Sequence, residues 1–134
     1  MKTFEFIING RPVSQQARRR EKLRVWKDTV RQAAEKYWPI ELKPATGLVM
    51  LKVTYFYEDF GMDVDNIVKP IQDAMKGLVY LDDDQITDVI VRKRNLSGNF
   101  RIENITPILA EGFARGNEFL HILITDAPDQ EVIF

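Results

Sequence analysis

The chain has 134 residues and a formal net charge of −1, and its hydrophobic (45%) and charged (29%) fractions are ordinary for a soluble globular protein. No apolar run is long enough to span a bilayer and no signal-peptide core is present, so we expect one cytoplasmic domain over residues 1–134, with no membrane partner. Because the sequence has no cysteine and a single histidine, His121, it excludes disulfides, thiolate metal sites and a multi-histidine zinc site, and any metal must be held by oxygen ligands.

The first half of the sequence reads as strand, helix and strand. Residues 3–9 alternate loosely and end at Gly10, which predicts a strand followed by a turn. From about residue 16 to Tyr37 apolar residues recur at steps of three and four, which predicts an amphipathic helix stopped by Pro39. Residues 48–57 are rich in β-branched and aromatic residues and are predicted to form the second strand.

The predicted first helix carries a concentration of positive charge. Residues 18–31 contain seven basic and two acidic residues. Arginine at a helix start opposes the helix dipole, so contact with phosphate explains these residues better than a solvated surface does. A local basic segment can bind nucleic-acid phosphates even when the whole protein is slightly acidic. The predicted DNA-binding residues are Arg18, Arg19, Arg20, Lys22, Arg24 and Lys27.

The second half continues the alternation. A helix is predicted from about Val64 to Gly77, with Asp65 or Asn66 capping its N-terminus and with Pro70 placed near its first turn, where proline is tolerated. A strand over residues 85–93, a short helix over about 106–114 and a last strand over 118–125 complete the chain, with a loose tail or interface arm after residue 125. The order β-α-β-α-β-(α)-β predicts an α+β domain in which two main helices back a mixed sheet of about four strands.

The acidic residues gather around this second helix. Residues 56–84 contain eight acidic and two basic residues, a density of like charge that destabilises a fold unless a cation neutralises it. Asp63 and Asp65 can both reach one cation where the chain turns into the helix, and the acidic run 82–84 can supply a third ligand. Three hard oxygen ligands suit Mg²⁺, with Mn²⁺ as a possible substitute.

The acidic run leaves a choice of ligand open. If residues 82–84 enter a strand, Asp82 and Asp84 point one way and Asp83 the other, and alternation does not choose between them. Taken separately, Asp65 is also explained as a helix cap and the acidic run as a solvated turn. Their joint presence favours a metal site, because Lys69 lies between them, one turn beyond Asp65 and on the same face of the helix, where it can meet the charge of a phosphate.

The stretch from residue 63 to residue 86 resembles the signature of the RusA family of Holliday junction resolvases, found in phages and prophages. It reads D-V-D-N-I-V-K-P-I-Q-D-A-M-K-G-L-V-Y-L-D-D-D-Q-I. The family pattern is D-x-D-N, then K, then D-A-L-x-G, then D-D-x-Q, and the one departure is Met75 at the usual leucine.

The resemblance implies a homodimeric, magnesium-dependent endonuclease that cuts four-way DNA junctions by paired, symmetric incisions. Carried over by position, Asp63, Asp65 and Asp83 are the metal-binding catalytic carboxylates and Lys69 is the catalytic lysine. Asp73 also matches a motif position, and we expect it to support Lys69 by pairing with it at i, i+4.

Two alternative functions remain open from the sequence. The best-known family members carry an aromatic residue in the basic loop after the first strand, whereas nothing aromatic lies between Gly10 and Val25. One alternative is therefore a nuclease for other branched DNA, such as flaps or forks. The other is a prophage remnant that binds DNA or metal without cutting, and the intact motif argues against it.

Overall fold

The computed structural model describes residues 3–39, 41–59 and 61–133, and its centre is a four-stranded mixed sheet. The strand order is β1-β4-β2-β3, so the last strand of the chain lies between the first and the second. Strand β4 is antiparallel to both of its neighbours, whereas β2 and β3 are parallel. The predicted α+β class and mixed sheet are confirmed. The strands are β1 (Phe4–Asn9), β2 (Val49–Tyr57), β3 (Ile86–Asn95) and β4 (Phe119–Asp126).

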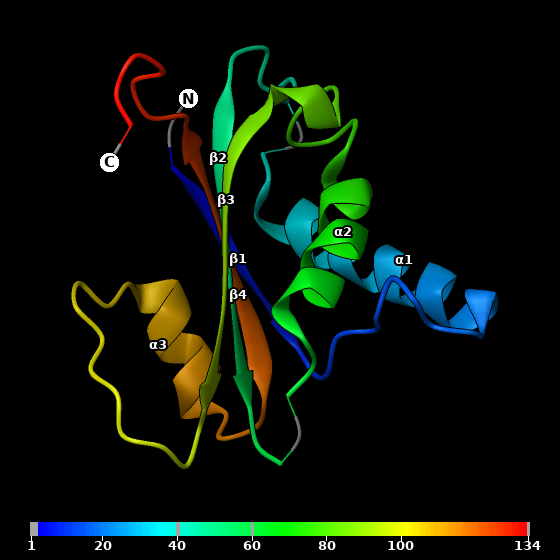
Figure 1. Cartoon of the computed structure of the whole chain (residues 1–134), viewed down its shortest axis with the longest axis vertical. Helices are drawn as coiled ribbons and strands as arrows, with labels where there is room; N and C mark the ends of the chain where they lie inside the picture. Colours follow the sequence, from blue (N-terminus) through cyan, green and yellow to red (C-terminus); the bar gives the residue numbers. More distant parts are fainter. Residues whose placement is uncertain (1–2, 40, 60, 134) are drawn as a thin grey trace.

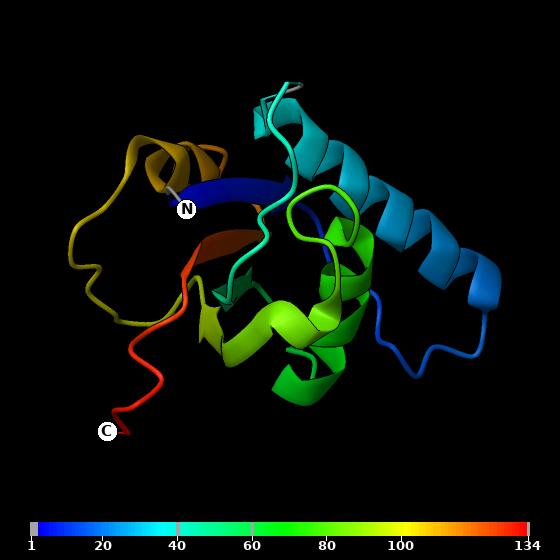
Figure 2. The same ribbon diagram turned by 90° about the horizontal axis from the view of Figure 1, so that it is seen from above.

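Three helices cover the two faces of this sheet. Helices α1 (Arg20–Tyr37) and α2 (Val64–Met75) lie on one face, and α3 (Pro107–Ala114) lies on the other (Figures 1 and 2). Parallel strands need a crossover connection, and α2 supplies it between β2 and β3. The crossover carries both acidic motif segments, one at the start of α2 and one just before β3. Among the residues that the structure describes, no helix is both long and apolar enough to cross a membrane.

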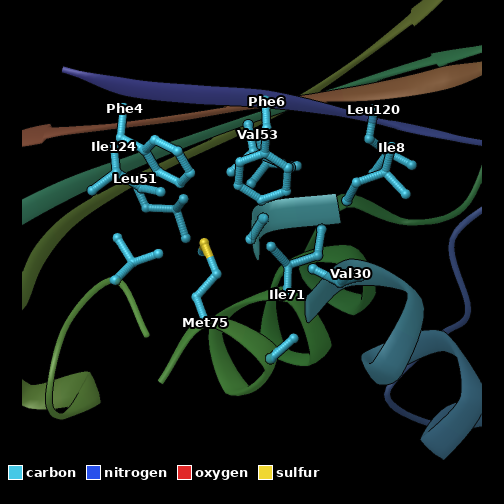
Figure 3. Packing of buried hydrophobic residues seen from close by; sticks show 14 of the residues in the cluster. Phe4, Phe6, Ile8, Val30, Leu51, Val53, Ile71, Met75, Leu120 and Ile124 are labelled. Atoms are coloured by element: carbon cyan, nitrogen blue, oxygen red, sulfur yellow. The ribbon is translucent and has the colours of Figure 1, made fainter. Parts of the chain in front are cut away.

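The main core lies between the sheet and helices α1 and α2. Figure 3 shows Phe6 and Val53 projecting from the sheet toward Val30 of α1 and toward Ile71 and Met75 of α2. All five side chains are fully buried. The three-and-four spacing along α1 and the alternation along β1 and β2 therefore face each other across one apolar layer, as their periods predict.

Helix α1 begins later than predicted. Its first residue is Arg20, whereas the periodic pattern begins at about residue 16. The reason is a local turn at Ser14, whose hydroxyl accepts a hydrogen bond from the Gln16 N–H (3.0 Å) and whose carbonyl accepts one from the Ala17 N–H (3.0 Å). Such a turn competes with helical hydrogen bonding, so the helix starts only after it.

Helix α2 corrects two predictions. The residue at its N-cap is Asp63, not Asp65 or Asn66, and the carboxylate of Asp63 makes no capping hydrogen bond. Pro70 lies inside the helix and not near its first turn. Since proline has no N–H, the carbonyl of Asn66 loses its helical partner, and it accepts a hydrogen bond from the Gln15 N–H instead (3.3 Å). This hydrogen bond joins the segment before α1 to the first turn of α2, and Pro70 makes the carbonyl of Asn66 available for it.

The acidic run is a turn and not the start of a strand. Residues Asp83–Gln85 form a short 3-10 helix, and β3 begins only at Ile86. Asp82 is the N-cap, and its carboxylate accepts a hydrogen bond from the Asp83 N–H (2.7 Å) while Gln85 reaches back to the Asp82 N–H (2.9 Å). This reciprocal pair is a capping box, and it overrides the strand alternation expected for residues 82–84.

Candidate active site

Lys69 joins the two acidic segments. Its ammonium nitrogen lies 3.0 Å from Asp73 Oδ1 and 3.0 Å from Asp83 Oδ2. The predicted pairing of Lys69 with Asp73 is therefore confirmed. The other oxygen of Asp73 lies 3.2 Å from the ammonium nitrogen of Lys27 in α1. A chain of alternating charges thus connects α1, the outer face of α2 and the turn before β3.

Asp83 differs from the other two aspartates of its turn. Asp82 caps the turn and pairs with Lys76 (3.4 Å), and Asp84 is exposed, whereas Asp83 faces Lys69. The Oδ1 atom of Asp83 is buried and has no hydrogen-bond partner in the described residues. A buried carboxylate oxygen without a partner is costly, so this atom is suited to receive a cation or an ordered water.

Asp63 and Asp65 lie at the start of α2, on the same crossover. Both are exposed, and neither forms a hydrogen bond or ion pair through its carboxylate with another described side chain. Within residues 3–39, 41–59 and 61–133, no three acidic, histidine or cysteine side chains are grouped so as to hold a metal ion. The structure therefore brings Asp83 to Lys69 but does not gather the three carboxylates, and their shared metal site stays a prediction.

The contacts around Lys69 fix charges of opposite sign. Hydrogen bonds to Asp73 and Asp83 raise the pKa of Lys69 above its ordinary value, so its side chain is cationic at neutral pH. Burial raises the pKa of Asp73, but hydrogen bonds from Lys69 and Lys27 outweigh it, and the net shift of the pKa is downward. Beneath them Tyr80 is buried, which raises its pKa, and its hydroxyl donates to the carbonyl of Gln72 (2.6 Å).

Gln85 holds the acidic turn in place, a role that the sequence motif did not reveal. Its side-chain oxygen accepts hydrogen bonds from the N–H groups of Leu81 (2.7 Å) and Asp82 (2.9 Å). Its amide nitrogen donates to the carbonyls of Ala45 and Gly47, each at 2.8 Å. A buried amide with these four bonds fixes the turn against the loop before β2. The D-x-x-Q spacing of a capping box is the signal in the sequence that predicts half of this role.

Glu118 forms a second cluster that no motif indicated. Its carboxylate accepts hydrogen bonds from Arg11 (2.9 Å), from the Tyr55 hydroxyl (3.2 Å) and from the Glu58 N–H (3.3 Å). Burial, together with the charge of Glu118, raises the pKa of Tyr55 to about 12. The cluster anchors the end of β2, from which the chain continues to Asp63. Its members lie 60 or more positions from Glu118 in the sequence, so a local pattern does not predict it.

The predicted DNA-binding residues fall into two groups. Arg24 forms ion pairs with Glu21 and with Asp28 (3.3 Å), and Lys27 is engaged by Asp73. Four others are exposed and form no ion pair with a described carboxylate, which leaves their charges available to an external anion. These four are Arg18, Arg19, Arg20 and Lys22.

The basic residues Arg18, Arg19, Arg20 and Lys22 are unpaired in the described structure, and the segment before them is bonded to the first turn of α2, the helix that carries Lys69. Unpaired cations together with a lysine held by carboxylates are suited to the cleavage of nucleic-acid phosphodiesters. The model of the family Endodeoxyribonuclease RusA matches residues 9–103, which is more than half of the chain. The chain belongs to the RusA family and is a Holliday junction endodeoxyribonuclease. The match ends before α3 and β4. A search of curated proteins found no significant match.

Proposed function

We propose that this RusA family member is a magnesium-dependent, homodimeric enzyme that hydrolyses paired phosphodiesters at a four-way junction, with Asp63, Asp65 and Asp83 as metal ligands. The observation that supports it most is the 3.0 Å contact between Lys69 and Asp83. This contact joins two motif segments that are 14 positions apart in the sequence. It also leaves one oxygen of Asp83 buried and without a partner in the described structure.

The residues present fit a divalent ion by their chemistry. Asp83 offers its unpartnered buried oxygen, and Asp63 and Asp65 are exposed carboxylates that no described cation engages. Carboxylate oxygens are the ligands that Mg²⁺ and Mn²⁺ prefer. When bound, such an ion polarises the phosphodiester and lowers the pKa of a coordinated water.

Lys69 supplies a fixed positive charge beside Asp83. Its ammonium group is held between Asp73 and Asp83, and its side chain is still 46% exposed, so a phosphate can approach it from solvent. A cation held in place before the substrate arrives stabilises the negative charge that grows on the phosphate in the transition state. Exposed Arg18, Arg19 and Arg20 would bind neighbouring phosphates of the same DNA.

The direct test is cleavage of a synthetic four-way junction with and without Mg²⁺, with a fork and a linear duplex as comparison substrates. We expect Asp65→Asn and Asp83→Asn to abolish cleavage, because each removes a metal ligand. Both variants should bind the junction as tightly as the wild type or more tightly, since repulsion between carboxylate and phosphate falls.

The matched control is Asp84→Asn, which changes an exposed aspartate in the same acidic turn that forms no ion pair in the described structure. This variant should cleave like the wild type. Full cleavage by either Asp65→Asn or Asp83→Asn, or equal cleavage in the presence of a chelator, contradicts the proposed metal site.

A further inference from the structure

Helix α3 lies on the sheet face opposite to α1 and α2 (Figure 1). A second cationic site lies on this face, beside the segment that leads into α3. It is a cleft of about 570 Å³ between the exposed side of β2 and β3 and the segment that leads into α3. We call it the basic cleft. Four cationic side chains line it, namely Lys52 of β2, Arg92 and Arg94 of β3, and Arg101 of the segment before α3.

The acidic residues of the basic cleft pair with only one of these four cations. Glu103 forms a long ion pair with Arg101 (3.6 Å). Glu5 also lines the cleft but pairs with none of the four cations, because it accepts a hydrogen bond from the Thr106 hydroxyl (2.9 Å) and lies 2.7 Å from Nε2 of His121. In the described part of the chain, Lys52, Arg92 and Arg94 form no ion pair with a carboxylate. Three unpaired positive charges in one cleft favour the binding of an anion.

The strand geometry presents two guanidinium groups to the same ligand. Arg92 and Arg94 are two positions apart on β3, so they project from the same face about 6.6 Å apart along the strand. Arg92 is also fixed by a hydrogen bond to the hydroxyl of Thr54 (3.2 Å) on the neighbouring strand. Arg94 donates a hydrogen bond to the carbonyl of Lys93 (3.0 Å). Two guanidinium groups on one strand face are suited to a polymer that carries a phosphate at every repeat, since guanidinium matches phosphate geometry.

An aromatic ring completes the basic cleft. Phe100 is 37% exposed, and its ring packs against Phe56 (5.8 Å between centroids) inside the lining. Cationic grooves with a partly exposed aromatic ring bind nucleic-acid strands, because the cations contact the backbone and the ring stacks on a base. An aromatic side chain in a purely electrostatic anion site has no such use.

We propose that the basic cleft binds the phosphodiester backbone of DNA, at a part of the substrate other than the part held at Lys69. The proposal rests on the proposed function, in that the substrate is branched DNA, and it adds a second contact surface on the opposite face of the sheet. A branched substrate has several strands and arms, so one arm is able to meet the basic cleft while another is cut. The basic cleft then selects substrates that present more than one arm.

The test compares Arg92→Gln/Arg94→Gln with Lys43→Gln/Arg115→Gln, a control that removes two exposed cations outside the basic cleft. Affinity for a labelled four-way junction is measured at several salt concentrations in a chelator, so that no cleavage occurs. If both arginines contact phosphates, the slope of log affinity against log salt falls by about 2, whereas the control keeps the wild-type slope.

Two further probes identify which DNA occupies the basic cleft. A linear duplex and a single-stranded oligonucleotide are titrated in the same way, together with Phe100→Leu. If the occupant is a single strand, Phe100→Leu weakens binding of the oligonucleotide and leaves the duplex unchanged. If it is a duplex arm, the arginine pair weakens duplex binding and Phe100→Leu has no effect.

An unchanged salt slope in the arginine variant overturns the proposal, and so does a change in oligomeric mass with unchanged DNA affinity, which would assign the basic cleft to a second copy of the chain. Because Arg92 bonds to Thr54, a variant Arg94→Gln/Arg101→Gln keeps the test valid if the first pair unfolds, as checked by thermal melting. If the wild type cuts junctions and all the variants bind DNA with the wild-type affinity, the role of the basic cleft is refuted. The proposed metal site is not affected by that result.

Discussion

At the scale of single residues, Lys69 holds the folded site with the same ammonium group to which we assign a role in catalysis. Its ammonium group holds Asp73 and Asp83 at 3.0 Å each, so it stabilises the folded site. The same positive charge is the one that we propose to meet the scissile phosphate. Under this proposal a substrate phosphate would compete with two carboxylates for Lys69. Lys27, which also pairs with Asp73, would keep that carboxylate partnered during the competition.

The pairing of Asp73 makes stability depend on pH in a defined direction. The pKa of Asp73 is lower in the folded than in the unfolded chain, so its stabilising contribution is present above its ordinary value and is lost as the pH falls through the folded-state pKa. We expect Asp73→Asn to lower the free energy of unfolding by about 1 kcal/mol near neutral pH.

This difference should disappear once the pH is below the pKa of Asp73 in the folded chain. Urea unfolding of both proteins across the acidic range measures it, with Asp84→Asn as a control that stays near the wild type throughout. A difference between wild type and Asp73→Asn that persists in strong acid would show that packing, and not charge, makes the contribution.

Gln85 gives a second prediction at this scale. Gln85→Ala leaves two N–H groups and two carbonyls without their partner, so we expect a loss of about 2–4 kcal/mol in the free energy of unfolding, at about 1 kcal/mol per bond. Cleavage should fall further than stability alone explains, because Asp83 lies in the turn that Gln85 fixes. Gln16→Ala, which changes an exposed glutamine, is the control. Wild-type melting and cleavage by Gln85→Ala would contradict this positioning role.

At the scale of elements, α3 approaches β4 so closely that only glycine fits at one position. A Cβ added to Gly112 would lie 2.3 Å from the ring of Phe119. That ring cannot move aside, because it is fully buried and packs between the rings of Phe56 and Phe113. The distances between ring centroids are 4.8 Å to Phe56 and 5.2 Å to Phe113. The glycine therefore sets the distance between α3 and the sheet.

We expect Gly112→Ala to destabilise the protein by about 1–3 kcal/mol through overpacking, although alanine is favoured over glycine in a helix by up to about 1 kcal/mol. Thermal melting measures the difference. Gly47→Ala is the control, because Gly47 is exposed and a Cβ there meets nothing within 4 Å. Equal melting temperatures for the two variants would mean that α3 shifts freely on the sheet.

The elements also show which features a sequence predicts. The sequence pattern located the four strands and the three α-helices to within a few residues, because each buries one face, and the D-x-D-N and D-D-x-Q motifs indicated the candidate site. Three local features escaped it. Ser14 forms a turn that delays α1, Asp82 and Gln85 form a capping box in place of a strand, and Pro70 redirects the carbonyl of Asn66 to Gln15. Each depends on a hydrogen bond that a hydrophobic pattern does not report.

At the scale of the whole molecule, the sheet separates two cationic surfaces. The exposed basic residues before and in α1 belong to the side with α2, and the basic cleft belongs to the side with α3 (Figure 2). The near-zero net charge conceals this distribution. The sequence predicted the first surface from a run of neighbouring residues, whereas the second is assembled from β2, β3 and the segment before α3 and needs the fold to appear.

Paired, symmetric incisions need two active sites related by a two-fold axis, so we expect two copies of the chain to associate. Light scattering should give a mass of about twice the 15.6 kDa of one chain in the concentration range in which junctions are cut. A 15.6 kDa species that makes both incisions on one junction in a single binding event would contradict the homodimer.

The strand order has a consequence for how the protein is made. Strand β4 is the last of the four strands to be synthesised, yet it lies between β1 and β2, and β1 has no other neighbour in the described sheet. A nascent chain that has been synthesised only as far as β3 therefore lacks the strand that joins β1 to β2. Strand β1 is synthesised before the other strands and stays without a partner until β4 has been made. The sheet is therefore completed only after translation of Asp126.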